Sequence, residues 1–168
     1  DGILWSAGRE LIKPTRLISE EDISQTFGTI TNGLLGASKI FCSKNFWSSS
    51  GGSLLLVSSV SAMRSNHGMT VYSGAKAALS GIMKSLSVEL SSRRVRVNCI
   101  LLGAIKTEMH QRIIKYLNED SLIEYEQKHL LGFGELEDIN PMIIYLMSDA
   151  SSWMTGSNIV LDGGFNAK

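Results

Sequence analysis

The sequence predicts an α/β fold in which a parallel sheet is covered by helices on both faces. Short apolar runs with strand character alternate along the whole chain with longer amphipathic segments of helical period. Parallel neighbours need crossover connections, and right-handed crossovers of this kind place helices on both faces of a sheet. The length of 168 residues and the hydrophobic fraction of 43% suit a single domain, residues 1–168, with a substantial core.

The N-terminal half contains two predicted strands and one long helix. Residues 3–5 form a short apolar strand. Ser19 is a typical N-cap, because acids follow it in the first turn, and apolar residues at helical spacing then continue to Phe41. A pair of glycines ends this helix. Residues 53–58 form the next strand, whose continuous apolar run indicates burial on both faces.

The C-terminal half continues the alternation. Apolar residues at helical spacing predict a helix over residues 70–90, and a β-branched run predicts a strand over residues 95–101. Another apolar run predicts a final strand at residues 158–161. Between them, we expect Asp138 to cap a helix that carries Pro141 near its first turn.

The connection that follows the third strand is long. Residues 109–133 contain helical stretches but no further strand. A connection of this length is typical of a lid over a ligand site, although a pair of surface helices is the alternative.

Composition excludes several classes of function. The 16 basic residues balance the 16 acidic ones, so no electrostatic footprint for nucleic acid or an anionic membrane is present. No apolar run is long enough to span a bilayer and no leader is recognisable, which makes the cytoplasm the expected compartment. Cys42 and Cys99 are expected to be buried thiols. The three histidines have no ligand spacing, and we expect no metal site.

Three polar residues indicate proton-transfer chemistry. Tyr72 and Lys76 are four residues apart, so on a helix both side chains lie on one face. A nearby ammonium favours the phenolate, and we expect Lys76 to lower the pKa of Tyr72 toward neutrality. Ser59 ends a buried strand, where open α/β sheets place their ligands. Together these residues describe a site that polarises and protonates a carbonyl.

Several motifs in order resemble the classical short-chain dehydrogenase/reductase family, especially its 3-oxoacyl-acyl-carrier-protein reductase-like members. The similarity runs from residue 1 almost to the C-terminus. The motifs that carry it are Asp1 to Gly8 (similar to a strand ending in Asn-Asn-Ala-Gly), Thr31-Asn32-Gly33, Ser58-Ser59-Val60, Tyr72 to Lys76 (Tyr-x-x-x-Lys), Val97-Asn98 through Gly103 to Thr107, and Thr155-Gly156 through Asp162-Gly163-Gly164.

The resemblance implies an NAD(P)-dependent oxidoreductase that interconverts a carbonyl and an alcohol, with 3-oxoacyl reduction as one candidate reaction. Tyr72 would donate the proton, and Lys76 would lower its pKa and hold the nicotinamide ribose. Ser59 would hydrogen-bond the substrate oxygen, and Asn32 would hold a water in a relay behind Lys76. The cofactor, NADP(H) or NAD(H), would contact Ser6, Ala7, Gly8, Tyr72, Lys76, Gly103, Ile105 and Thr107.

Three residues and one segment depart from the family pattern. Trp5-Ser6 stands where the family has Asn-Asn, which weakens the expected contact of Ser6 with the cofactor, and Leu102 replaces a proline. No Gly-x-Gly-x-x-Gly opens a helix. We therefore expect residues 1–168 to be the C-terminal, catalytic part of a Rossmann-type doubly wound parallel sheet. Without the N-terminal βαβαβ part and its phosphate site, this chain alone is expected to be inactive.

The expected partners are a small carbonyl or alcohol substrate and a second copy of the chain. In the family that the sequence resembles, helices corresponding to residues 19–46 and 70–91 and the terminal strand pair subunits into dimers or tetramers. The alternative is therefore a truncated, non-catalytic remnant that acts as an oligomerisation or interaction module.

Overall fold

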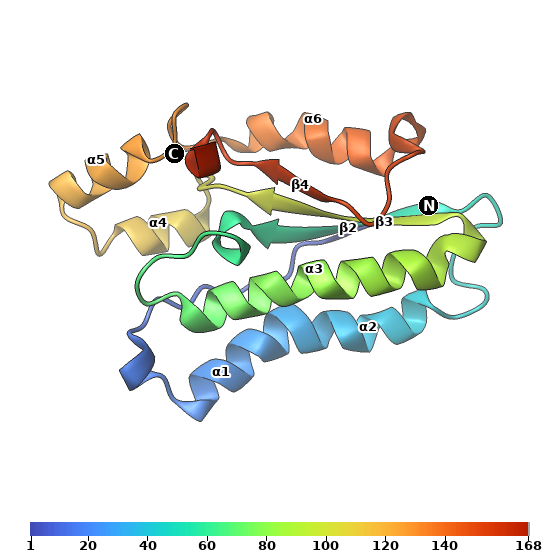
Figure 1. Ribbon diagram of the computed structural model, residues 1–168, viewed down its shortest axis with the longest axis horizontal. Coiled ribbons are helices and arrows are strands. Elements are labelled where there is room, and N and C mark those ends of the chain that lie inside the picture. The colour runs from blue at the N-terminus through green and yellow to red at the C-terminus, as the bar shows by residue number, and fades with distance from the viewer. Residues whose placement is uncertain (168) are drawn as a thin grey trace.

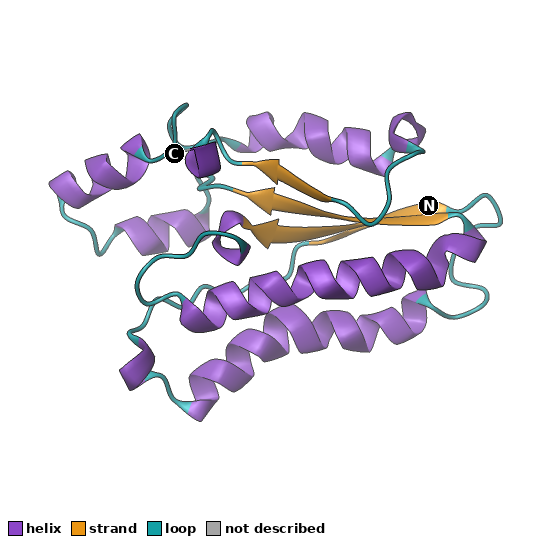
Figure 2. Cartoon of the chain, viewed as in Figure 1, coloured by secondary structure: helices purple, strands orange, loops and turns teal. Residues whose placement is uncertain are grey.

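A computed structural model describes residues 1–167 and shows one sheet with four parallel strands in the order β1-β2-β3-β4 (Figure 1). The strands are β1 (Gly2–Trp5), β2 (Gly52–Ser59), β3 (Val95–Leu102) and β4 (Asn158–Leu161). Every neighbouring pair is parallel. The sheet with its covering helices confirms the predicted α/β class (Figure 2).

Helices cover both faces of the sheet. On one face lie α1 (Glu20–Phe27), α2 (Gly33–Phe41) and α3 (Thr70–Leu90), and on the other lies α6 (Leu136–Met147) (Figure 1). Two shorter helices, α4 (Glu108–Ile114) and α5 (Glu119–Gln127), lie beyond the carboxyl ends of the strands (Figure 1). The functional site is expected at that end of a parallel sheet.

Burial on both faces explains why the strands are continuously apolar. Leu54 and Leu56 of β2 belong to a core shared with α2 and α3, and both are fully buried. Leu55, between them, belongs instead to the core on the other face, where Leu146 of α6 contacts it. Successive side chains of a strand point to opposite faces, so each of these three leucines has its own set of partners.

Two helices differ from the prediction in detail. The first long helix contains a π-helical segment, Gly28–Asn32, that separates α1 from α2. The last helix begins at Leu136 with Glu135 as its N-cap, so Asp138 is not the cap. The Asp138 carboxylate instead accepts a hydrogen bond from the Glu135 backbone N–H at 2.7 Å, which makes it the second half of a capping box. Pro141 consequently lies inside the helix.

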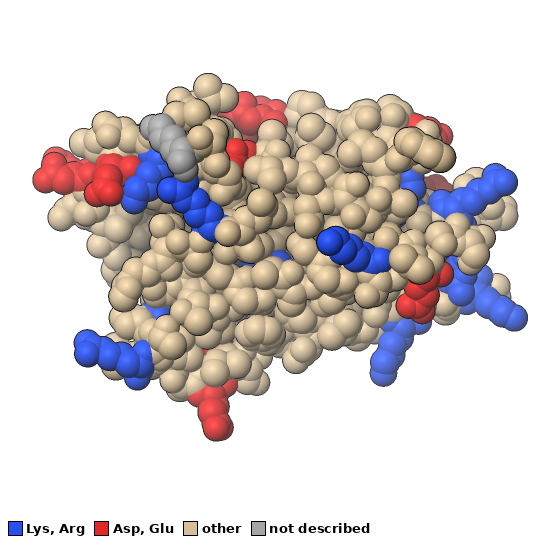
Figure 3. Space-filling model, in the orientation of Figure 1, with Lys and Arg blue, Asp and Glu red and all other residues tan. Residues whose placement is uncertain are grey.

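Charged side chains are scattered over the surface. On the face seen in Figure 3, basic and acidic residues are separated by uncharged surface and form no large patch of one sign. No helix within residues 1–167 is both long enough and apolar enough to cross a membrane.

Candidate active site

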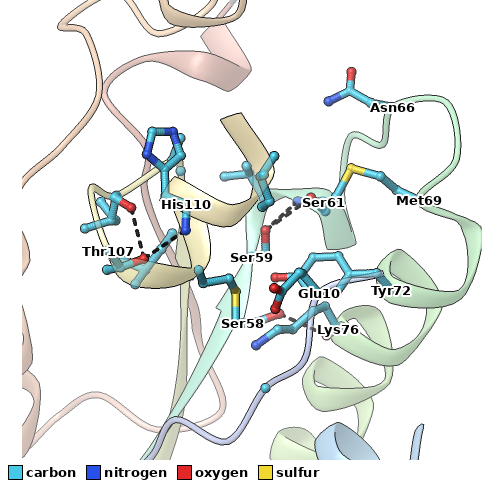
Figure 4. A pocket seen from close by; sticks show the side chains of 18 of the residues that line it. Glu10, Ser58, Ser59, Ser61, Asn66, Met69, Tyr72, Lys76, Thr107 and His110 are labelled. Atoms are coloured by element: carbon cyan, nitrogen blue, oxygen red, sulfur yellow. Dashed lines mark hydrogen bonds between the residues drawn. The ribbon is translucent and has the colours of Figure 1, made fainter. Parts of the chain in front are cut away.

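A cavity of about 360 Å³ lies at the carboxyl ends of the strands. Its walls come from the segment after β1, the end of β2, the start of α3, the segment after β3, and helices α4 and α5. Figure 4 shows Thr107 and His110 on one side, Tyr72 and Met69 on the other, and Ser59 between them. Because these segments are far apart in the sequence, the cavity depends on the whole sheet.

Ser59 and Tyr72 meet in this cavity. Ser59 is the last residue of β2, and Tyr72 lies in the first turn of α3, where its side chain is 9% exposed. The Ser59 hydroxyl lies near enough to the phenol to lower the Tyr72 pKa, against the larger effect of burial. The Ser59 Oγ donates to the Ser61 Oγ and accepts from the Ser61 backbone N–H, both at 3.2 Å (Figure 4). The serine hydroxyl is therefore held beside the phenol.

Lys76 also lines the cavity, one turn after Tyr72 on α3. Its side chain is buried, and its Nζ donates to the Val57 carbonyl oxygen at 2.9 Å. The Nζ lies 5.9 Å from the centre of the Tyr72 ring. Burial lowers the pKa of Lys76 to about 8. The amine is thus mostly charged near neutral pH. Burial of this ammonium group costs free energy, because it has no carboxylate partner in the described chain.

The expected lowering of the Tyr72 pKa by Lys76 is wrong for this structure. Burial raises the pKa of Tyr72 above its usual value, and the nearby Ser59 hydroxyl only partly opposes that rise. Lys76 does not counteract the burial because its ammonium points to the Val57 carbonyl. Tyr72 is consequently a neutral phenol at physiological pH, which is the protonation state that a proton donor needs.

The segment after β3 forms the opposite wall with Gly103, Ile105 and Thr107, as the sequence predicted. Thr107 is the N-cap of α4: its Oγ1 accepts from the His110 backbone N–H at 3.3 Å and donates to the Ile105 carbonyl at 3.3 Å. Ile105 forms a parallel bridge with Gly134, which attaches the segment to the chain that precedes α6. The wall is therefore held by backbone contacts on both sides.

Gly103 is required by close packing. A Cβ added there would lie 2.8 Å from the Asp162 Cα and 3.0 Å from its carbonyl oxygen, both backbone atoms. We expect Gly103→Ala to displace the end of β4 and to lower the free energy of unfolding by about 1–3 kcal/mol. Gly36→Ala is the control, because nothing lies within 4 Å of that Cβ on α2. Chemical denaturation checks the pair, and equal stability of both variants would contradict the packing argument.

The segment after β1 contributes Ser6 and Gly8 to the cavity, whereas Ala7 is not among its lining residues. Asn32 is also placed elsewhere: it is exposed at the end of the π-helical segment and does not line the cavity. Its neighbour Thr31 is the buried residue, with its hydroxyl 3.5 Å from the Ala75 carbonyl of α3. The structure does not place Asn32 in the cavity with Lys76, so its role in a relay stays a prediction.

Five titratable or aromatic residues of the lining were not predicted from the sequence as site residues. They are Glu10, His110, Tyr125, His129 and Phe165. Only the lid-like length of residues 109–133 hinted at three of them. Nothing in the sequence indicates that Glu10 pairs with Arg112 at 2.7 Å, joining the segment after β1 to α4. Nor does it indicate that Phe165 is buried against the His129 ring, with centroids 4.8 Å apart.

His129 connects the wall after β3 to α5. Its Nε2 accepts from the Ala104 backbone N–H at 3.1 Å, so this nitrogen carries no proton. The other ring nitrogen, Nδ1, then donates to the Tyr125 carbonyl at 3.3 Å. Burial lowers the pKa of His129 below 6.5. Protonation would place two N–H groups face to face and break the contact with Ala104.

We expect the protein to lose stability as the pH falls below about 6.5. The folded state holds His129 neutral, while the unfolded chain takes up a proton at the ordinary histidine pKa. The free energy of unfolding is therefore greatest above that ordinary pKa, and it falls as the pH drops through the lower pKa of the folded state. His129→Gln should weaken this dependence, since its amide oxygen accepts without titrating. Thermal unfolding from pH 7.5 to 5 checks it, with exposed His67→Gln as control. An unchanged pH dependence in His129→Gln would contradict the assignment.

Comparison with known proteins identifies the family of the chain. A family model described as enoyl-(acyl-carrier-protein) reductase matches residues 1–166. Human dehydrogenase/reductase SDR family member 4 is 34% identical over 114 residues, and the 3-oxoacyl-[acyl-carrier-protein] reductase FabG of Chlamydia trachomatis is 39% identical over 114 residues. The solved structure of 4-hydroxyisoleucine dehydrogenase complexed with NADH superposes over the whole chain with a TM-score of 0.91 and 27% identity.

The chain belongs to the short-chain dehydrogenase/reductase family, whose similar members are oxidoreductases. The segments that match the human and chlamydial proteins cover 68% and 67% of this chain but only 41% and 44% of those relatives. The structural superposition covers 69% of the 4-hydroxyisoleucine dehydrogenase chain. The chain thus corresponds to part of the length of its relatives.

Proposed function

We propose that this protein is an oxidoreductase that interconverts a carbonyl compound and an alcohol with NAD(H) or NADP(H). The observation that carries the proposal is the cavity that brings the buried phenol of Tyr72 together with Ser59 and Lys76. In this proposal residues 1–168 supply the catalytic portion of a Rossmann-type fold. A purely structural role would not require a serine, a tyrosine and a lysine to share a cavity whose lysine is buried without a carboxylate.

The cavity has groups that suit the nicotinamide end of such a cofactor. Lys76 offers an ammonium, Thr107 a hydroxyl, and the segment after β3 a backbone edge, while Ser6 and Gly8 form the adjoining wall. Gly8 has no side chain beside Lys76. A Cβ added there would lie 3.4 Å from the Lys76 Nζ, the group that would hold the ribose. When bound, the reduced nicotinamide supplies a hydride.

The residues of this chain then manage the substrate oxygen. Tyr72, neutral because burial raises its pKa, gives its proton to the carbonyl oxygen as that oxygen gains charge. Ser59 donates a hydrogen bond to the same oxygen and holds the carbonyl in place. This transfer leaves a phenolate on Tyr72. Lys76, whose ammonium donates to the Val57 carbonyl, would hold the nicotinamide ribose. In the oxidation direction, the same phenolate would accept the proton of the alcohol.

The test is oxidation of NADH or NADPH by the purified full-length protein in the presence of a panel of ketones and aldehydes, because residues 1–168 alone are expected to be inactive. The activity measurements below use the same full-length protein. We expect consumption of the reduced nicotinamide that depends on the carbonyl compound. Binding of each nicotinamide, measured by calorimetry, accompanies the assay. Binding of neither form, together with no turnover, would overturn the proposal.

Reduction of a 3-oxoacyl group is the narrower candidate reaction. It is supported by the similarity to the chlamydial 3-oxoacyl-[acyl-carrier-protein] reductase. The ratio of kcat/KM for a 3-oxoacyl thioester to that for a simple ketone of the same length tests it. A ratio near one would remove this candidate and leave the broader function intact.

Self-association is part of the proposed function. On α3, which the family resemblance places in the subunit contact, Leu79, Met83 and Leu86 are buried within the chain. Support comes instead from apolar side chains exposed on α6 and β4, among them Ile144 at 67% and Val160 at 41%.

We expect a dimer or larger assembly by light scattering, and Ile144→Lys should shift the protein toward a monomer, because a buried interface does not accept an unpaired charge. Met63→Lys is the control, since Met63 is 64% exposed and lies outside the helices and the strand that are expected to pair subunits. A monomer in the unmodified protein would reject self-association.

A further inference from the structure

After the last strand the chain turns back to the cavity, and Phe165 is the residue that this turn brings there. Gly163 and Gly164 follow β4 with φ angles of 57° and 84°, in the left-handed region that favours glycine. Phe165 then begins a short helical turn, Phe165–Ala167. Its side chain lines the cavity and is 5% exposed. A residue far along the chain from Ser59 and Tyr72 therefore forms part of the same wall.

Hydrogen bonds fix the turn that carries Phe165. The Asp162 carboxylate accepts from the backbone N–H groups of Gly164 and Asn166, each at 2.9 Å. The Phe165 backbone N–H donates to the Asp162 carbonyl oxygen at 3.1 Å. The backbone therefore holds Phe165 at the wall.

Two side chains from other parts of the chain hold the Phe165 ring itself. The His129 ring packs against it, with centroids 4.8 Å apart and planes at 35°. The Arg64 guanidinium, from the loop between β2 and α3, lies 5.5 Å from the centre of the Phe165 ring, within the range of a cation–π contact. The Arg64 Nη1 also donates to the Phe165 carbonyl oxygen at 3.2 Å. A ligand that displaced the ring would have to break these contacts.

The volume of the cavity limits the size of a substrate. A protein cavity of about 150 Å³ holds one benzene ring. On that scale the cavity of about 360 Å³ holds about two rings. Under the proposed function the nicotinamide takes the room of one ring, and the substrate keeps the room of the other. A second substrate ring would have to displace part of the wall.

We infer that Phe165 sets the upper size of the substrate: the protein takes carbonyl compounds whose apolar part is about one six-membered ring and excludes those that carry a second ring. Arg64 is a positioning residue in this inference, because it holds Phe165 in the wall. The inference rests on the proposed oxidoreductase function, since it concerns the compound whose carbonyl Ser59 and Tyr72 bind.

The test measures binding of acetophenone and of its 2-, 3- and 4-phenyl derivatives, in which a second ring extends in three different directions. Dissociation constants are measured by ligand-observed NMR on the full-length protein saturated with NAD⁺ or NADP⁺, neither of which can reduce a ketone. We expect the unmodified protein to bind acetophenone at least about tenfold more tightly than each derivative, because overfilling a packed site forces its walls apart. Phe165→Ala should remove this difference for at least one derivative.

Three further variants test the interpretation. Phe165→Leu removes less volume and should shift the preference in the same direction by less, so it decides the question if thermal unfolding shows that Phe165→Ala does not fold. Phe46→Ala is the matched control, because Phe46 is not a lining residue and packs against Phe41 and Trp47 instead. It should keep the preference of the unmodified protein. Arg64→Met should shift the preference part of the way, and in the Phe165→Ala background it should add nothing.

The outcomes separate this inference from the proposed function. Equal binding of all four ketones to the unmodified protein, or a preference for acetophenone that persists in both Phe165 variants, overturns the size limit, and turnover of acetophenone would then still support the oxidoreductase. A further shift when Arg64→Met is added to Phe165→Ala overturns the positioning role of Arg64. Failure of the unmodified protein to bind either nicotinamide cofactor would overturn the proposed function and this inference with it.

Discussion

Tyr72→Phe is expected to reduce turnover by at least about a hundredfold while the fold stays intact. The variant removes the only proton that the proposed mechanism gives to the substrate oxygen. The aromatic ring remains packed in the core without its hydroxyl, and Ser59 keeps its hydrogen bonds to Ser61, so the free energy of unfolding should change little. Measurement of kcat and of the circular dichroism spectrum checks both statements.

Tyr116→Phe serves as the matched control, because Tyr116 is 87% exposed and lies outside the cavity. It should retain the activity of the unmodified protein. Near-normal turnover by Tyr72→Phe would exclude Tyr72 as the proton donor, and another group in the cavity would then have to supply the proton.

Lys76→Met is expected to abolish activity and, at the same time, to stabilise the protein. Burial lowers the pKa of Lys76 to about 8, so the folded state pays to keep this ammonium charged at pH 7. A methionine of similar length removes that cost. After subtraction of the lost hydrogen bond to Val57, we expect a gain of about 1–3 kcal/mol in the free energy of unfolding.

The pH dependence of this gain identifies its cause. The folded pKa of Lys76 is lowered, so the penalty is complete below about pH 8 and disappears as the pH rises toward 10.5, the value of the unfolded chain. The advantage of Lys76→Met should therefore shrink between pH 7 and pH 10. Lys84→Met, at an exposed position of the same helix, should show no such trend. A destabilised Lys76→Met variant would show that the buried amine supports the fold.

The order and class of the main elements could be predicted from the sequence because their signals are local. The helix over residues 70–90 has the bounds that its apolar period indicated, and the final strand at Asn158–Leu161 does as well. The boundary of α6 was missed because two acids competed for the N-cap. Glu135 takes that position, and the Asp138 side chain completes the cap from inside the helix.

The site was predictable only where one element carries the chemistry. Helical spacing places Tyr72 and Lys76 on one face, and the structure brings both to the cavity with Ser59. The same spacing could not show that the Lys76 ammonium turns to the Val57 carbonyl, which lies on another element. The direction of the Tyr72 pKa depends on that contact and on burial, and both are set by tertiary packing.

The residues at the far end of the cavity had no sequence signal of this kind. His110 looks like any polar residue of a short helix until Phe133 and Tyr125 are folded against it. Asn32 illustrates the opposite case. Its neighbours suggested a functional helix segment, but the π-helical turns of Gly28–Asn32 change which side chains face inward and leave Asn32 exposed.

The position of Phe165 has a consequence for how the molecule is made. This ring closes a wall whose other members begin at Ser6, and the Phe165 carbonyl also accepts a hydrogen bond from Arg64 at 3.2 Å. During translation, the first residues of the cavity are added about 8–30 s before Phe165. Until Phe165 is in place, the wall lacks the ring that packs against His129. The nascent chain therefore carries a binding site that is still unfinished.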